Sequence, residues 1–217
     1  MTADVATGCA GAILGPLQGR RPPAYGPEVF LPVTALGLAG TPGAVLTSGM
    51  VETLITIRNA RKGDAVEIAD VHDAAWRDAY RGVIPGRELE RMIARRGPKW
   101  WDAAIIRGSR LVVLDFDESI GGYASYGRNR VPSLPFQGEV FELYLAPEFQ
   151  GLGFGRRLFQ AARRDLAEHG YHTVLVWALA DNDRALGFYE RLGGRIVRRA
   201  QERFAGEMRD RVAFGFD

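Results

Sequence analysis

The chain has 217 residues, 47% of them apolar and 25% charged, which suffices for one well-buried domain with an extension. A formal net charge of +2 gives no support for a nucleic-acid partner, and no apolar run is long enough to span a membrane. The single cysteine, Cys9, excludes a disulfide framework and a cysteine zinc site within the chain and favours a reducing, cytoplasmic setting.

The first 49 residues differ in composition from the rest. They hold only four charged residues but six prolines and nine glycines, and neither a helical nor a strand period persists in them. This composition predicts a disordered extension over residues 1–49 and a domain over residues 50–217. Met50 stands just before the first strand-like run. We therefore hypothesise that Met50 is the true initiator and that residues 1–49 are a gene-model artefact, the alternative being a genuine leader.

The domain shows alternating strand and helix patterns, with glycine or proline at the breaks. In chain order, the predicted elements are a strand over 54–58, a helix from an Asp64 N-cap to Tyr80, a helix over 87–96, a hairpin of strands over 110–115 and 119–126, a loop over 127–138, a strand over 139–145, a glycine turn, a helix over 155–169, a buried strand over 173–180, a helix over 182–191, and strands over 195–199 and 209–216. This order indicates a single α/β (α+β) domain with a mixed central sheet of about six to seven strands flanked by helices.

The stretch Gln150-Gly-Leu-Gly-Phe-Gly155 lies between a predicted strand and a predicted helix. Its glycines make a turn in which no Cβ blocks a ligand. The amides at the helix start, with Arg156 and Arg157, form a site for a phosphate-bearing ligand. A mononucleotide P-loop would need a following lysine, and a dinucleotide fingerprint would need Gly-x-Gly-x-x-Gly early in the chain. Both fits fail, whereas Gln/Arg-x-x-Gly-x-Gly/Ala fits at every fixed position.

A second run, Asn182-Asp-Arg-Ala-Leu-Gly-Phe-Tyr-Glu-Arg-Leu-Gly193, follows the next strand. With both motifs at this separation, residues 54–217 resemble the GNAT superfamily of acyl-CoA-dependent N-acyltransferases. The segment Trp76–Pro85 also resembles a pattern common in bacterial members. The resemblance implies that acetyl-CoA binds in a wedge between a splayed pair of strands, residues 139–145 and 173–180.

The resemblance also implies which residues contact acetyl-CoA. Backbone groups of one strand would pair with the pantetheine arm, and the Leu143 amide would polarise the thioester carbonyl. Amides of the glycine loop would hold the pyrophosphate. Gln150 is the family's Gln/Arg position or a brace for the loop, and Asn182 contacts CoA or caps a helix. The backbone contacts are Leu143, Tyr144 and Leu145 for the arm, and Gly151, Leu152, Gly153, Phe154, Gly155 and Arg156 for the pyrophosphate.

The expected chemistry calls for an acid and a base, because the attacking amine must lose a proton and the departing thiolate must gain one. The resemblance makes Tyr189 the acid near the sulfur, with a core aromatic as the alternative. Glu139 and Glu142 are the candidate bases. Three residues apart on a strand, they are expected on opposite faces. The family's placement favours Glu139, while ordered water is the alternative if the glutamates are solvated or ion-paired.

The histidines and the aromatic residues outside the two motifs give weaker evidence about function. His72, His169 and His172 form no metal constellation, so no metal cofactor is expected. Five aromatic residues either line an acceptor pocket beneath the first two helices or pack the core, and they are Trp76, Tyr80, Trp100, Trp101 and Tyr126.

The expected function is transfer of an acetyl group from acetyl-CoA to a primary amine by direct attack in a ternary complex. The acceptor is a small molecule, a protein N-terminus or a lysine, with no nucleic-acid or membrane partner. A homodimer is one expectation, because family members are often dimers. A catalytically silent acyl-CoA-binding sensor or interaction module is the alternative function, and the failed dinucleotide fingerprint disfavours an oxidoreductase.

Overall fold

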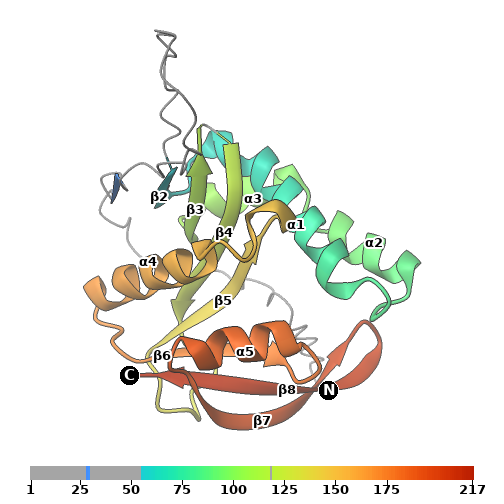
Figure 1. Cartoon of the computed structure of the whole chain (residues 1–217), viewed down its shortest axis with the longest axis vertical. Helices are drawn as coiled ribbons and strands as arrows, with labels where there is room; N and C mark the ends of the chain where they lie inside the picture. The colour runs from blue at the N-terminus through green and yellow to red at the C-terminus, as the bar shows by residue number, and fades with distance from the viewer. Residues whose placement is uncertain (1–27, 30–54, 118) are drawn as a thin grey trace, which may run out of the picture.

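The computed structural model describes residues 28–29, 55–117 and 119–217. Their strands form one sheet in the order β1-β2-β3-β4-β5-β6-β8-β7 (Figure 1). The strands are β1 (Glu28–Val29), β2 (Ile55–Asn59), β3 (Arg110–Phe116), β4 (Ser119–Arg128), β5 (Gly138–Leu145), β6 (Val174–Leu179), β7 (Arg195–Phe204) and β8 (Glu207–Phe216). Neighbours are antiparallel except β5 and β6. The mixed sheet confirms the predicted fold class.

Part of the predicted domain organisation concerns residues that the structure does not describe. Apart from the two residues of β1, the predicted extension over residues 1–49 lies outside the described residues, and so does Met50. Strand β1 pairs antiparallel with β2 at the edge of the sheet, with Glu28 opposite Ile57 and Val29 opposite Thr56.

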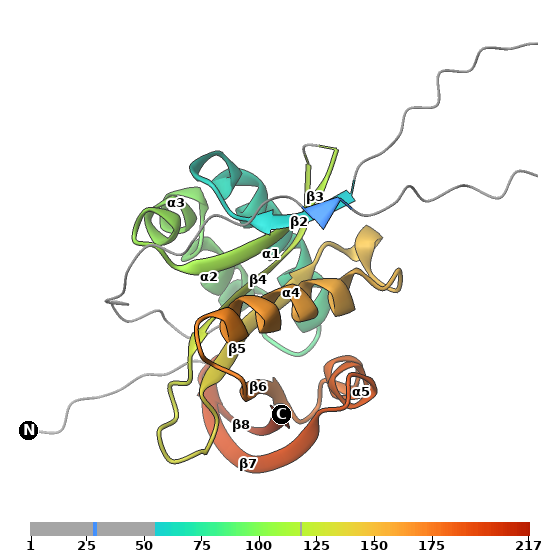
Figure 2. The same cartoon turned by 90° about the vertical axis from the view of Figure 1, so that its left-hand side faces the viewer.

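The helices divide between the two faces of the sheet (Figure 2). They are α1 (Ala65–Tyr80), α2 (Gly86–Ala94), α3 (Pro98–Ile106), α4 (Phe154–Glu168) and α5 (Asp183–Arg191), with single turns η1 (Lys62–Asp64) and η2 (Pro147–Phe149). Leu158 and Ala162 of α4 are buried with Val140 of β5. On the other face Ile68 of α1 and Trp101 of α3 form a separate buried cluster. Helices α1, α3 and α4 therefore each bury an apolar stripe against the sheet.

Helix α3 is absent from the sequence prediction. The pair Gly97-Pro98 is predicted there only as the stop of the preceding helix. In the structure Pro98 is the first residue of α3, a position where its missing N–H costs nothing because no helical partner exists for it. Trp101 and Ala104 of this helix are buried. Helix α2 already ends at Ala94, and Pro98 begins a new helix.

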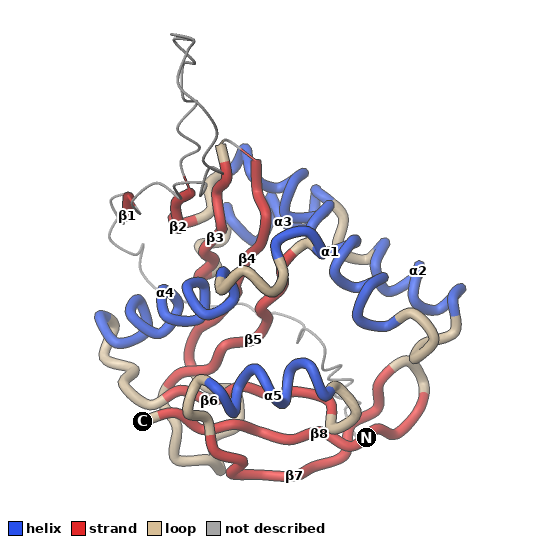
Figure 3. Tube along the Cα trace, in the orientation of Figure 1, coloured by secondary structure: helices blue, strands red, loops and turns tan. Residues whose placement is uncertain are grey.

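Strands β7 and β8 are longer than predicted, with ten residues each (Figure 3). The turn Ala205-Gly206 has φ values of 51° and 87°, the left-handed pair that a two-residue hairpin turn requires. The far end of the hairpin reaches α1, where the Phe204 and Tyr80 ring centroids lie 5.4 Å apart. Arg209 donates to the Val83 carbonyl at 2.9 Å. The hairpin therefore covers the turn between α1 and α2.

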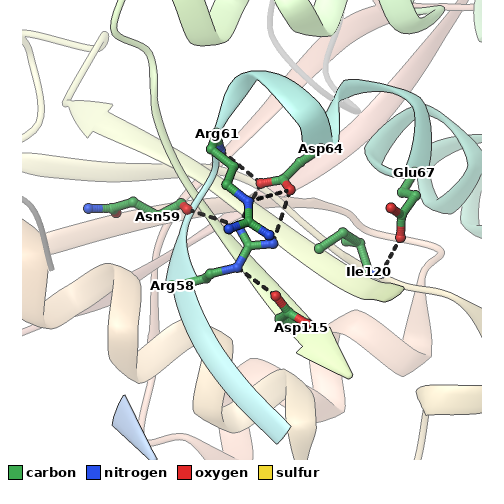
Figure 4. Close-up of polar contacts among 7 residues, drawn as sticks. All are labelled: Arg58, Asn59, Arg61, Asp64, Glu67, Asp115 and Ile120. Atoms are coloured by element: carbon green, nitrogen blue, oxygen red, sulfur yellow. Dashed lines mark hydrogen bonds and ion pairs between the residues drawn. The ribbon is translucent and has the colours of Figure 1, made fainter. Parts of the chain in front are cut away.

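Asp64 stands at the N-cap position of α1, but its carboxylate does not cap that helix (Figure 4). It accepts hydrogen bonds from Arg58 at 2.7 Å and from the Arg61 amide at 2.8 Å. Arg58 also pairs with Asp115 of β3 at 2.6 Å. The predicted capping role was wrong, because the part-buried guanidinium of Arg58 takes the carboxylate as an ion-pair partner.

Candidate active site

Strands β5 and β6 pair only over their first residues, Gly138–Val140 with Val174–Val176. Beyond that point β5 continues beside β4 and β6 continues beside β8, so the two strands diverge (Figure 1). Within the described chain, their facing edges then have no strand partner. Such edges offer unpaired N–H and C=O groups to an extended ligand, which can bind as an added strand.

A pocket opens at this split. Its walls come from α1, the loop after β4, β5, β6, α5 and β8. Six predicted site residues line it, and they are Glu139, Glu142, Leu143, Tyr144, Asn182 and Tyr189. Residues that the sequence places more than 40 positions apart thus meet around one cavity.

The glycine loop runs from Gln150 into α4, which begins at Phe154. Gly151 and Gly153 have φ values of +75° and +84°, which residues with a Cβ rarely adopt. The first amides of a helix have no helical acceptor, so they are donors for an anion. The Gln150 side chain donates to the Leu145 carbonyl at 3.2 Å and accepts from Arg184 at 2.6 Å. Gln150 therefore braces the loop between β5 and α5.

Gly155 lies at a close contact between α4 and α5. A Cβ at this position would lie 3.2 Å from the Phe188 ring, whereas a Cβ at Gly153 would meet no atom within 4 Å. Glycine at 155 thus allows α4 and α5 to approach each other. The expectation that a side chain at 153 or 155 would collide with phosphate stays a prediction, and at 153 the positive φ adds a conformational requirement.

Replacing Gly153 by alanine is expected to weaken CoA binding about tenfold. An alanine at φ near +84° costs about 1–2 kcal/mol, and CoA needs the loop in this conformation. Isothermal titration calorimetry with CoA measures the effect. The matched control is Gly86→Ala at the start of α2, where φ is not positive and nothing lies within 4 Å. Equal CoA affinities for the two variants would contradict the role given to Gly153.

Asn182 and Tyr189 come from α5. The Asn182 Oδ1 accepts a hydrogen bond from the Ala185 amide at 3.0 Å, so Asn182 caps the helix while it lines the pocket. The Tyr189 side chain is 7% exposed and packs between Phe188 and Phe214. Burial raises the pKa of the Tyr189 hydroxyl, and Tyr80 adds to the rise. The phenol therefore stays protonated at neutral pH.

Glu139 and Glu142 lie on the same face of β5, so the expectation of opposite faces was wrong. Two adjacent residues of β4 stand opposite Val140 and Glu142, which leaves Phe141 as an extra residue in β5. A bulge of this kind shifts the alternation of side chains by one position. Both glutamates consequently line the pocket.

Each glutamate is buried and paired with an arginine that the sequence analysis did not assign. Glu139, 1% exposed, accepts from the Arg130 amide at 3.0 Å and from its Nε at 3.1 Å. Glu142, 6% exposed, forms an ion pair with Arg96. The partners lie 9 and 46 residues away, and no local pattern in the sequence marks them.

A buried polar chain extends from Glu142 to α1. The Glu142 Oε2 accepts from the Tyr123 hydroxyl at 3.4 Å and from the Ser125 hydroxyl at 3.4 Å. The Tyr123 hydroxyl lies 2.9 Å from His72 Nδ1. Burial, with the charge of Arg96, lowers the pKa of His72 to about 3, so this imidazole is neutral at physiological pH. The neutral ring holds Tyr123 against Glu142.

The other sequence candidates lie elsewhere. Of the five aromatic residues proposed for an acceptor pocket, only Tyr80 lines the cavity, whereas Trp76, Trp101 and Tyr126 are core residues. Within the described part of the chain, His, Cys, Asp and Glu form no group able to hold a metal ion. The same residues contain no helix of the length and apolarity needed to cross a membrane.

The sheet is mixed and splits between two parallel strands, and a glycine loop at a helix N-terminus lies beside the split. These features define the class of α/β domains that hold a phosphate-bearing ligand against a strand edge. The profile of the Acetyltransferase (GNAT) family matches residues 68–194, more than half of the chain. The chain belongs to this family of acyl-CoA-dependent N-acetyltransferases, which confirms the resemblance found in the sequence.

Relatives agree with this membership. The chain is 29% identical over 163 residues to the uncharacterized N-acetyltransferase YuaI of Bacillus subtilis, covering 75% of this chain and 93% of that protein. It is 34% identical over 113 residues to the mycothiol acetyltransferase of Paenarthrobacter aurescens, covering 52% of this chain but only 33% of that protein. The fold matches the PaiA N-acetyltransferase of Thermoplasma acidophilum, solved with coenzyme A, with a TM-score of 0.61, 18% identity, and coverage of 75% and 99%.

The residues of the split fit acetyl-CoA, the family's acyl donor. The open edge of β5 over Leu143–Leu145 offers the backbone groups that an amide-bearing pantetheine arm pairs with. The loop amides and the Arg156 side chain offer donors and positive charge for a pyrophosphate. When bound, acetyl-CoA supplies an activated acetyl thioester.

Proposed function

We propose that this protein transfers the acetyl group of acetyl-CoA to a primary amine by direct attack in a ternary complex. The observation that supports direct attack is the composition of the pocket. Among the described residues that line it there is no cysteine, serine, threonine or lysine, the side chains that commonly carry an acyl group between two half-reactions. The amine must then attack the thioester itself, with both substrates bound together. A cytoplasmic location is part of the proposal, because the single cysteine fits a reducing compartment.

Two groups act on the acetyl-CoA thioester, one at its carbonyl oxygen and one at its sulfur. The Leu143 amide, on the open half of β5, donates to the oxygen on which negative charge develops. Tyr189 lines the same pocket, and its raised pKa keeps a proton on the hydroxyl. We assign to Tyr189 the protonation of the CoA thiolate as it leaves.

Glu142 is proposed as the group that accepts the amine's proton. Glu142 directly precedes Leu143, whereas Glu139 lies three residues, or roughly 10 Å, further back along the strand at about 3.3 Å per residue. The Glu142 carboxylate accepts hydrogen bonds at 3.4 Å from the hydroxyls of Tyr123 and Ser125, and these hydroxyls can adjust to a change of charge on the carboxylate. Glu139 has three donors from Arg130, which suits an anchor for that arginine. The structure thus supports Glu142 over the residue that the sequence pattern favoured.

The proposal is tested by acetyl-CoA-dependent release of free thiol with a panel of primary amines, using the full chain. Glu142→Gln is expected to lower kcat by about 10²-fold, the usual contribution of a general base. Its matched partner on the same face, Glu139→Gln, is expected to raise KM and to lower kcat less. A larger kcat loss for Glu139→Gln would transfer the role of base to Glu139. Absence of CoA binding by calorimetry would end the proposal.

One observation favours a second function. Both candidate bases are ion-paired with arginines, an arrangement that also suits a catalytically silent acyl-CoA-binding sensor or interaction module. Such a module would bind CoA with ordinary affinity and release no thiol with any amine of the panel. The same two measurements therefore separate the two functions.

A further inference from the structure

Two guanidinium groups stand on opposite walls of the pocket, each stacked on an aromatic ring. Arg130, from the loop after β4, lies over the Phe141 ring at 4.0 Å. Arg211 of β8 lies over the Trp177 ring of β6 at 3.9 Å. All four side chains line the cavity. Stacking on a ring fixes the plane of a guanidinium, so its N–H donors keep a defined direction.

Each stacked arginine is also held by a buried carboxylate. Glu139 pairs with Arg130, and the Glu202 Oε2 lies 2.8 Å from Arg211 Nη1. The side chains of Arg130 and Arg211 are nevertheless 31% and 18% exposed, so both reach the pocket surface. Two anchored cations that remain accessible are the features of an anion-binding subsite.

The register of the sheet places these groups on the acceptor side. Trp177 pairs with Ala213, two residues from Arg211, so Trp177 and Arg211 share a face. Leu179, on that same face, packs with Tyr80 of α1 and not with α4. Glu139 and Glu142 face the same side across the split. Positively and negatively charged side chains therefore surround the space that lies under α1 and the β7–β8 hairpin.

We infer that the acceptor is a small amine that also bears a carboxylate, as an α-amino acid does; the inference rests on the proposed acetyl transfer. Its carboxylate binds the stacked guanidinium of Arg211 or Arg130, and its amino group is directed to Glu142. A polyamine finds no such match, because each pocket carboxylate already has an arginine partner and the guanidinium groups repel a second positive charge. The guanidinium groups also favour the neutral, nucleophilic form of the bound amine.

The first test compares acceptors that differ only in the carboxylate. The full chain is assayed for thiol release with L-amino acids, with their amides, and with the matching decarboxylated amines, and with spermidine as a polycation. Loss of a charge-assisted contact predicts a kcat/KM about 10- to 100-fold lower for each amide and amine than for its amino acid.

The second test changes the arginines. In the double variants Arg211→Gln/Glu202→Gln and Arg130→Gln/Glu139→Gln, which change the two walls in turn, no buried carboxylate is left without its partner. Both variants are expected to bring the ratio of kcat/KM for amino acid and amide down toward one, with CoA affinity by calorimetry unchanged. The control variant Arg195→Gln removes an exposed arginine outside the pocket, and its ratio is expected to match the unmodified protein.

The outcomes separate this inference from the function on which it rests. Amides, simple amines or spermidine accepted as well as amino acids would overturn the inference and leave acetyl transfer standing. A ratio that stays unchanged in both arginine variants would also overturn it. Binding of CoA without transfer to any member of the panel would overturn the inference and the proposed activity together.

Discussion

Replacing Tyr189 by phenylalanine is expected to lower kcat by about 10²-fold or more and to leave CoA affinity unchanged. A positioned general acid contributes about 10²–10⁴ to the rate. The ring contacts survive the change, since Phe188 and Phe214 pack against the ring at 5.0 and 5.6 Å between centroids. Among the described residues nothing hydrogen-bonds the Tyr189 hydroxyl, so its removal leaves no internal partner unsatisfied. Steady-state thiol release and calorimetry with CoA measure the two effects.

The matched control is Tyr171→Phe, because Tyr171 packs against the same core without lining the pocket. This variant is expected to keep kcat within about twofold, as surface-side changes away from a site usually do. The pH profile gives a further check. Since burial raises the pKa of Tyr189, the acid stays protonated as pH rises, and no alkaline loss of kcat is expected below about pH 10. An unchanged kcat in Tyr189→Phe would remove the tyrosine from the mechanism.

The donor half of the site was predictable from the sequence because its determinants are local. Gly151 and Gly153 mark backbone with positive φ, and a helix follows directly. Asn182 stands three residues before the amide that it caps. Features of this kind depend on residues within one turn of each other, so spacing alone reveals them.

The acceptor half depends on contacts between distant parts of the chain. The bulge at Phe141 exists only because β4 pairs with β5 in a particular register, and a pattern read along one strand places Glu139 and Glu142 on opposite faces. Nothing in the local sequence distinguishes Arg96, Arg130 and Arg211 from arginines on the surface. Only the folded sheet shows that each of them pairs with a buried glutamate. The proposals for the general base and for the acceptor class therefore depend on the folded structure and could not be made from the residues alone.

The second large effect is expected in stability. Arg96→Met should lower the free energy of unfolding by about 3–5 kcal/mol, because it leaves the buried carboxylate of Glu142 without its cationic partner. Both side chains are nearly inaccessible, at 10% and 3% exposure, so water cannot replace the guanidinium. Arg96 also lies over the Trp100 ring at 4.7 Å, a packing contact that methionine keeps in part. Urea unfolding measures the change.

Two further variants identify the cause of that loss. The double variant Arg96→Met/Glu142→Leu removes both charges and is expected to recover most of the lost stability, since replacing a buried ion pair by apolar residues is often neutral. Arg77→Met breaks the exposed pair between α1 and Glu90 of α2 and is expected to change stability little, because solvent screens that pair.

If Arg96→Met were no more destabilising than Arg77→Met, Glu142 would not depend on Arg96 for its charge. The pair would then be open to solvent, and the carboxylate would be accessible to an acceptor from that side. If the loss appears and the double variant reverses it, the ion pair with Arg96 fixes the Glu142 carboxylate in place beside the pocket, where we propose that it accepts a proton from the acceptor amine.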